Sequence, residues 1–139
     1  KDLKKKFGIK KPSIKILGLN PHAGENGKIG SEEQDIIIPA IKKLRKSKID
    51  VSLPMSADTA FSGKHLNETD AYFGMYHDQV LPVLKAISFG ESINITLGVP
   101  IIRTSVDHGV ALDIAGSNNS DTSSLELAFE SANNLIKWI

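Results

Sequence analysis

Short apolar segments that alternate with helix-forming segments constrain the fold of this 139-residue chain more than any other feature. Five short apolar runs, each closed by turn-forming residues, have the pattern of buried strands. They are residues 14–19, 49–53, 71–76, 93–98 and 101–105. Strands that alternate with helices indicate a layered α/β fold with a largely parallel sheet. We expect the chain to form a single domain or a large piece of one.

Two segments carry the start signals of amphipathic helices. Ser31 with Gln34, and Ser123 with Glu126, each match a capping box. Apolar side chains follow both boxes at helical spacing. Those behind Ser123 are Leu125, Ala128, Phe129, Ala132, Leu135, Ile136 and Ile139. The lysine-rich residues 1–12 have no such pattern, and we expect a solvated arm or the end of a preceding helix there.

Composition argues against several classes of protein. A formal net charge of +1 gives no electrostatic reason to expect a nucleic-acid partner or a membrane partner. No apolar run approaches the roughly 20 residues that a membrane span needs. The chain has no cysteine, which excludes a disulfide scaffold and a thiolate metal site. This composition fits the reducing cytoplasm, where we expect the protein to be located.

Polar side chains follow the predicted strands. In open α/β sheets, ligands bind outside the carboxyl ends of the strands, where loops and helix N-termini converge. The polar residues at such places are His22, Asp58, His77, Asp78, Arg103, Asp107 and His108. Each residue alone is a weak signal, but their shared position relative to the strands predicts a ligand site.

Residues 18–30 (GLNPHAGENGKIG) form the most unusual loop. A phosphate loop of the Walker type requires Ser or Thr after Gly-Lys, and here Ile29 follows Lys28. The glycine spacing does not match the dinucleotide-binding pattern either. Two interpretations are left for His22. It is either a surface histidine on a plain turn, or an imidazole placed to bind a metal or an anion.

His77 ends an apolar segment and is followed by Asp78, so it either binds a metal or begins the next helix. Two histidines are too few for a catalytic divalent ion, which usually takes three protein ligands. Lys85, Asn94 and Arg103 form a further group. They are either solvated residues or ligands of an anion such as phosphate, which suits the planar fork of Arg103.

The longest motifs together resemble the 4-hydroxythreonine-4-phosphate dehydrogenase family of vitamin B6 biosynthesis. The motifs are GLNPHAGENGKIGSEE, ADTAF, MYHDQVLPVLK and NITLGVPIIRTSVDHGVALDIAG. The resemblance runs from about Ile14 to the end of the chain. It implies the fold of the isocitrate and isopropylmalate dehydrogenases, with two domains per subunit, and a homodimer whose metal site is shared between subunits.

The resemblance also implies roles for individual residues. His22 and His77 would be two of the family's three metal-binding histidines, and the metal would be Zn, Mg or Co. Residues 107–116 resemble the cofactor loop, so His108 and Gly109 would contact NAD or NADP. Asp58 and Asp78 would orient the metal-binding histidines through hydrogen bonds without contacting the metal. The residues that would bind the phosphorylated substrate are Lys85, Asn94 and Arg103.

The reaction implied by the resemblance is the NAD(P)-dependent, metal-assisted oxidation and decarboxylation of 4-phosphohydroxy-L-threonine. The family's third metal histidine and a substrate-binding His-Thr pair lie in an N-terminal portion that this chain does not contain. We therefore expect the chain to correspond to the C-terminal half of such an enzyme and to be inactive alone. Two alternatives stay open: a dehydrogenase of a related four-carbon sugar-acid phosphate such as threonate 4-phosphate, and a non-catalytic metal-binding module.

Overall fold

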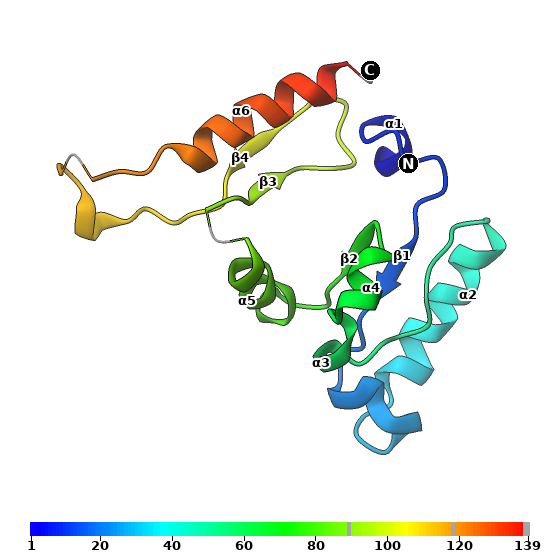
Figure 1. Cartoon of the computed structure of the whole chain (residues 1–139). Helices are drawn as coiled ribbons and strands as arrows, with labels where there is room; N and C mark the ends of the chain where they lie inside the picture. The colour runs from blue at the N-terminus through cyan, green and yellow to red at the C-terminus, as the bar shows by residue number, and fades with distance from the viewer. Residues whose placement is uncertain (89, 118, 138–139) are drawn as a thin grey trace. The chain divides into compact units, whose positions relative to one another are not determined.

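The computed structural model describes residues 1–88, 90–117 and 119–137, which form two compact units (Figure 1). The central unit is Lys11–Val83. The terminal unit joins Lys1–Lys10 to Leu84–Ile139. Each unit is described by itself below. The expectation that they belong to one domain stays a prediction.

Strand β1 (Ile14–Ile16) is the middle element of the central unit. It pairs in parallel with β2 (Ala71–Phe73) on one side. On its other side, Val51 and Met55 form parallel bridges with residues of the β1 segment. Helices combined with parallel pairing confirm the α/β class. The loops after these three segments lie at the same edge, because parallel segments run in the same direction.

The predicted strand 49–53 is not continuous, because its ladder is interrupted beside Ile16. The main-chain N–H of Ile16 donates to the Ser52 hydroxyl at 2.9 Å instead of to a carbonyl. Pro54 has no N–H to donate. Pairing resumes where the N–H of Met55 donates to the Ile16 carbonyl at 2.9 Å. The Ser52 side chain therefore satisfies a buried main-chain donor that the irregular segment would leave unpaired.

We expect Ser52→Ala to lower the free energy of unfolding by about 1–3 kcal/mol, because it leaves the buried N–H of Ile16 without an acceptor. Urea unfolding followed by circular dichroism measures this change. Ser47→Ala is the matched control, since the Ser47 hydroxyl is exposed and donates a long bond of 3.4 Å to the Lys43 carbonyl. Equal effects of the two substitutions would contradict this account of Ser52.

Helices cover the sheet of the central unit. A π-helical turn, η2 (Glu33–Ile37), runs into α2 (Ile38–Lys46), whose Ile41 is buried against Ile16 and Val51. The predicted capping box at the start of this helix is wrong. The Ser31 hydroxyl donates to the Asp35 carboxylate instead, an exposed bond of 2.6 Å. The remaining helices of the unit are α3 (Ala57–Ala60), α4 (Gly63–Asn67) and the first part of α5 (His77–Ile87).

The terminal unit contains an antiparallel pair, β3 (Ile93–Ile95) and β4 (Thr104–Val106). The prediction of a largely parallel sheet is therefore wrong here, and the predicted strand 101–105 begins only at Thr104. The physical reason is the short connection of residues 96–103. It can join a hairpin but cannot carry the dozen or more residues of a parallel crossover.

Helix α6 (Ser123–Ile136) packs on this hairpin, where the Thr104 hydroxyl donates to the Ala128 carbonyl at 2.9 Å. The predicted capping box of Ser123 and Glu126 is wrong, because the Thr122 hydroxyl donates to the Glu126 carboxylate at 2.8 Å. Within the described part of the chain, the side chain of the N-cap residue Thr122 makes no hydrogen bond to the main chain at this helix start. The predicted apolar stripe is only partly buried. Ala128 and Leu135 are buried, Leu125, Phe129 and Ile136 are exposed, and Ile139 lies outside the described residues.

The N-terminal residues are more ordered than expected for a solvated arm. Residues Asp2–Lys5 form the short helix α1. The Lys6 ammonium is largely buried and donates to the carbonyls of Val99 and Ile101 at 3.1 and 3.2 Å. Among the described residues, no helix is long and apolar enough to cross a membrane.

Candidate functional site

The loop after β1 has a left-handed backbone. It contains the 3₁₀ segment η1 (Pro21–Gly27), and the five residues from His22 to Asn26 all have φ between 43° and 79°. Only one of them, Gly24, is a glycine. For other L-residues this conformation costs roughly 1–2 kcal/mol each and normally occurs at single positions. A run of this kind persists only where surrounding contacts hold it, and such strain concentrates at functional sites.

The Glu33 carboxylate provides these contacts. Its side chain is 1% exposed, and it accepts hydrogen bonds from the Asn20 N–H at 2.8 Å and from the Asn20 amide at 2.9 Å. Burial alone would raise the pKa of Glu33, but the bonds from Asn20 lower it below its ordinary value. Gly24 is required at its place, because a Cβ there would lie 2.6 Å from the Glu33 carboxylate.

His22 stands on this loop with its imidazole 62% exposed. Its Nδ1 lies 2.8 Å from a carboxylate oxygen of Glu25. An ionised carboxylate can only accept, so Nδ1 carries the proton in this pair and Nε2 of the neutral ring keeps its lone pair. Metal-binding histidines typically have this arrangement. The sequence interpretation did not assign Glu25 to the site, although its position three residues after His22 is a signal for it.

His77 has the same arrangement at the first residue of α5. Its Nδ1 lies 2.6 Å from the Asp78 carboxylate, and the imidazole is 79% exposed. Gln79 fixes this helix start to the end of β1. The Gln79 amide donates to the Gly18 carbonyl at 2.6 Å and accepts from the Met75 N–H at 2.8 Å. The sequence interpretation gave Gln79 no role, because nothing in the sequence pairs it with Gly18.

Asp58 lies in α3, directly after the bridged segment of residues 51–55. It accepts a hydrogen bond of 2.5 Å from the Ser56 hydroxyl. That bond lowers the pKa of Asp58 below its ordinary value. Within the described part of the chain, no group of three or more His, Cys, Asp or Glu side chains could hold a metal ion. The two histidines therefore fit a divalent ion only if another ligand joins them.

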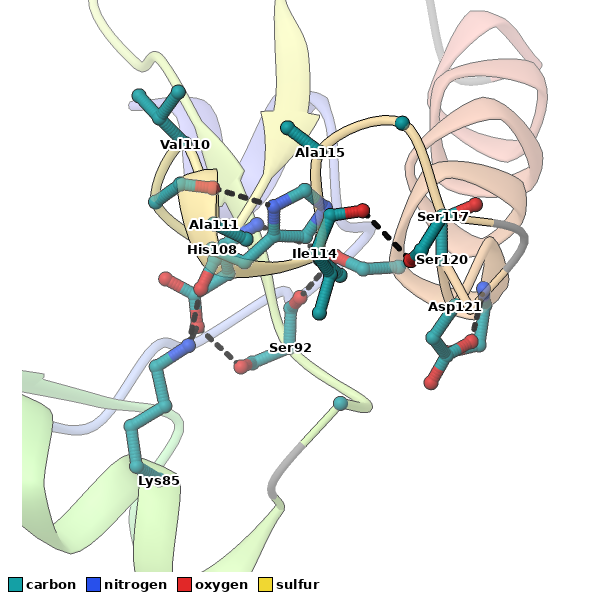
Figure 2. Close-up of a pocket in the computed structure, with 16 residues that line it drawn as sticks. Lys85, Ser92, His108, Val110, Ala111, Ile114, Ala115, Ser117, Ser120 and Asp121 are labelled. Carbon is teal, nitrogen blue, oxygen red and sulfur yellow. Dashed lines mark hydrogen bonds and ion pairs between the residues drawn. The ribbon is translucent and has the colours of Figure 1, made fainter.

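A cavity of about 490 Å³ lies in the terminal unit, and Figure 2 shows the side chains around it. Lys85, His108 and Gly109 line it, as does much of the loop after β4. The Lys85 ammonium pairs with Asp107 at 2.8 Å. His108 Nδ1 lies 3.0 Å from the Gly109 carbonyl, which orients the ring in this loop. Two carboxylates, Asp107 and Asp121, line the same cavity.

Asn94 and Arg103 lie on one face of the β3–β4 hairpin. Asn94 pairs with Ser105, and the Arg103 guanidinium donates to the Thr96 hydroxyl at 3.0 Å. Side chains alternate between the faces of a strand, so Asn94 and Thr96 point to the same side. Both Asn94 and Arg103 are exposed, and Arg103 precedes β4 rather than ending it.

The Asp107 carboxylate should make folding stability depend on pH. Hydrogen bonds from Lys85 and Ser92 lower the pKa of Asp107 below its ordinary value of 3.8. A depressed folded-state pKa contributes stability above pH 3.8, which is lost as the pH falls through the depressed value. Asp107→Asn should therefore destabilise the protein most at neutral pH, and less as the pH falls below 3.8. Urea unfolding at several pH values measures this, and a pH-independent difference would contradict it.

The chain matches the family described as "Pyridoxal phosphate biosynthetic protein PdxA" over residues 1–132. It is 57% identical over 131 residues to a 4-hydroxythreonine-4-phosphate dehydrogenase of Ectopseudomonas mendocina. It is 54% identical over 138 residues to one of Vibrio vulnificus. These matches cover 94% and 99% of this chain, but 39% and 42% of the relatives. The chain thus spans about two fifths of their length.

Solved structures of dehydrogenases also match most of this chain and about two fifths of their own length. The crystal structure of 4-hydroxythreonine-4-phosphate dehydrogenase from Klebsiella pneumoniae matches with a TM-score of 0.79 and 40% identity, over 92% of this chain and 39% of that one. A terephthalate 1,2-cis-dihydrodiol dehydrogenase from Burkholderia xenovorans matches with a TM-score of 0.71 and 32% identity. That match covers 93% of this chain and 41% of the other.

Proposed function

The chain belongs to the PdxA family of pyridoxal phosphate biosynthetic proteins, and we propose that it is part of a 4-hydroxythreonine-4-phosphate dehydrogenase. The full-length enzyme would oxidise and decarboxylate 4-phosphohydroxy-L-threonine with NAD or NADP. The observation that carries this proposal is the identity of 54–57% to dehydrogenases of that name over 94–99% of the chain. We further propose a homodimer of two-domain subunits with the isocitrate dehydrogenase fold.

His22 and His77 would hold the divalent metal through Nε2. The Glu25 and Asp78 carboxylates support this role, because each lies within hydrogen-bond distance of the Nδ1 atom of its histidine and so leaves Nε2 available. A third ligand would come from the rest of the full-length protein. The bound metal would lower the pKa of a coordinated hydroxyl and polarise a neighbouring carbonyl. Asp58 would add negative charge beside His22.

Lys85, Asn94 and Arg103 would bind the anionic substrate. An ammonium and a guanidinium suit phosphate and carboxylate groups, and the amide of Asn94 can donate to the same oxygens. Arg103 and Asn94 lie on one exposed hairpin face, and Lys85 lies at the wall of the cavity. His108 and Gly109 line that cavity, which supports their assignment to the nicotinamide cofactor.

The test is reduction of NAD or NADP by the purified full-length protein with 4-phosphohydroxy-L-threonine, and release of CO2. Threonate 4-phosphate is the competing substrate. A second candidate is a dehydrogenase of a diol without phosphate, which the match to the terephthalate dihydrodiol dehydrogenase favours. A higher kcat/KM for either competitor would replace the proposed substrate. Absence of turnover with all of them would favour the non-catalytic module.

A further inference from the structure

Asp107 contacts Lys85 in two ways. The Lys85 ammonium pairs with the Asp107 carboxylate at 2.8 Å and also donates to the Asp107 main-chain carbonyl. Asp107 directly follows β4 and is the first residue of the loop 107–117, most of which lines the cavity. The lysine that we assign to an anionic substrate is thus already paired with a carboxylate of the protein. That carboxylate belongs to the first residue of the loop 107–117.

Asp107 also has partners that connect it to the scaffold. The Ser92 hydroxyl donates to the same carboxylate oxygen that pairs with Lys85. The main-chain N–H of Asp107 donates to the Ser124 hydroxyl at 3.2 Å, and that hydroxyl in turn donates to the Ser92 carbonyl at 3.2 Å. Both serines are buried. Figure 2 shows the ends of the Lys85 and Ser92 side chains converging on the Asp107 carboxylate.

The four residues differ in their freedom to move. Ser92 and Ser124 are short, buried side chains beside β3 and in α6, so they fix one side of Asp107. Lys85 has a long side chain that is 33% exposed. Lys85 is therefore the member of this network that can change partner while Asp107 keeps its two serines. A phosphate monoester carries more charge than a carboxylate and competes with it for an ammonium.

We propose that Asp107 is a positioning residue, the resident counter-ion of Lys85, and that a phosphate group exchanges with it for the Lys85 ammonium. The exchange removes one of the contacts that hold the start of the loop 107–117, and so transmits phosphate binding to the cavity loop. This inference rests on the proposed function in one respect, the assignment of Lys85 to an anionic substrate. Asp107 itself contacts no substrate in this account.

Hydrogen exchange of the full-length protein tests the inference, with inorganic phosphate as the probe. Phosphate should accelerate exchange in residues 107–117 about tenfold, the effect of losing one charge-assisted bond. In Asp107→Asn the loop should exchange rapidly without phosphate and show no further response, and phosphate should bind at least as tightly. Glu91→Gln is the matched control, because Glu91 is exposed beside Ser92 and lies outside the cavity lining. It should behave like the wild type.

Lys85→Met provides a second variant, and it should show rapid loop exchange without phosphate and no response to it. Phosphate binding without faster loop exchange in the wild type would overturn the inference, as would a full response in Asp107→Asn. Failure of phosphate to bind the wild type would overturn it too. The proposed function fails separately: a phosphate-dependent loop without any NAD(P) reduction would refute the dehydrogenase assignment alone. Full activity with an unresponsive loop would refute the exchange alone.

Discussion

The variant His77→Asn of the full-length protein is expected to lose tight divalent-metal binding and about 10³-fold of kcat/KM, because a catalytic metal contributes several kcal/mol to transition-state stabilisation. Asn is chosen because its intrinsic helix propensity is close to that of His. The substitution therefore preserves the other role open to His77, that of beginning α5. Metal titration by calorimetry and steady-state kinetics measure the two effects.

The matched control for this substitution is His65→Asn. His65 lies in α4, and within the described part of the chain its Nδ1 is buried without a hydrogen-bond partner. It should keep wild-type metal affinity and activity. Asp78→Asn should have an intermediate effect of about 10- to 100-fold on metal affinity, as expected for a group that orients a ligand. Unchanged metal binding in His77→Asn would show that His77 only begins the helix.

The second large effect concerns Glu33. We expect Glu33→Ala to lower the free energy of unfolding by about 3 kcal/mol, because it leaves the main-chain N–H of Asn20 without its buried, charged acceptor and removes one of the two carboxylates to which the Asn20 amide donates. The left-handed loop around His22 should then relax toward ordinary backbone conformations. Metal affinity should fall together with stability, although Glu33 binds no metal in this account. Urea unfolding and metal titration of the same variant measure the two quantities.

Asp35→Ala is the matched control, since it removes a carboxylate two residues away. Asp35 is exposed, and within the described residues its carboxylate accepts one hydrogen bond, from the Ser31 hydroxyl. Its effect on stability should stay within about 0.5 kcal/mol, as for most surface substitutions. Loss of stability in Glu33→Ala with unchanged metal affinity would separate the carboxylate from the histidine loop and contradict its proposed positioning role.

The sequence predicted the parts of the fold that depend on local pattern. The apolar run at residues 14–19 contains β1, and the run at 71–76 contains β2, as expected. The sequence did not reveal that residues 49–53 pair irregularly, because that depends on the Ser52 hydroxyl opposite Ile16. The apolar pattern also did not indicate the direction in which β3 and β4 pair. The short loop before Thr104 forces an antiparallel hairpin.

The same limit applies to the site. Motif resemblance selected His22, His77 and Lys85, and their site roles stay predictions. Their partners depend on three-dimensional contacts. Asp107 contacts Lys85, which is 22 residues away in the sequence. Gln79 contacts Gly18, which is 61 residues away. The left-handed loop was not predicted either, because four of its five residues are not glycine and have no intrinsic preference for positive φ.

The most direct test of the metal site is X-ray diffraction at the absorption edge of Zn or Co, from crystals of the full-length protein grown with that metal. The account predicts one anomalous peak about 2.0–2.1 Å from Nε2 of both His22 and His77. Their Nδ1 atoms should still face the carboxylates of Glu25 and Asp78. A metal bound elsewhere, or bound through Nδ1 of either ring, would contradict the account.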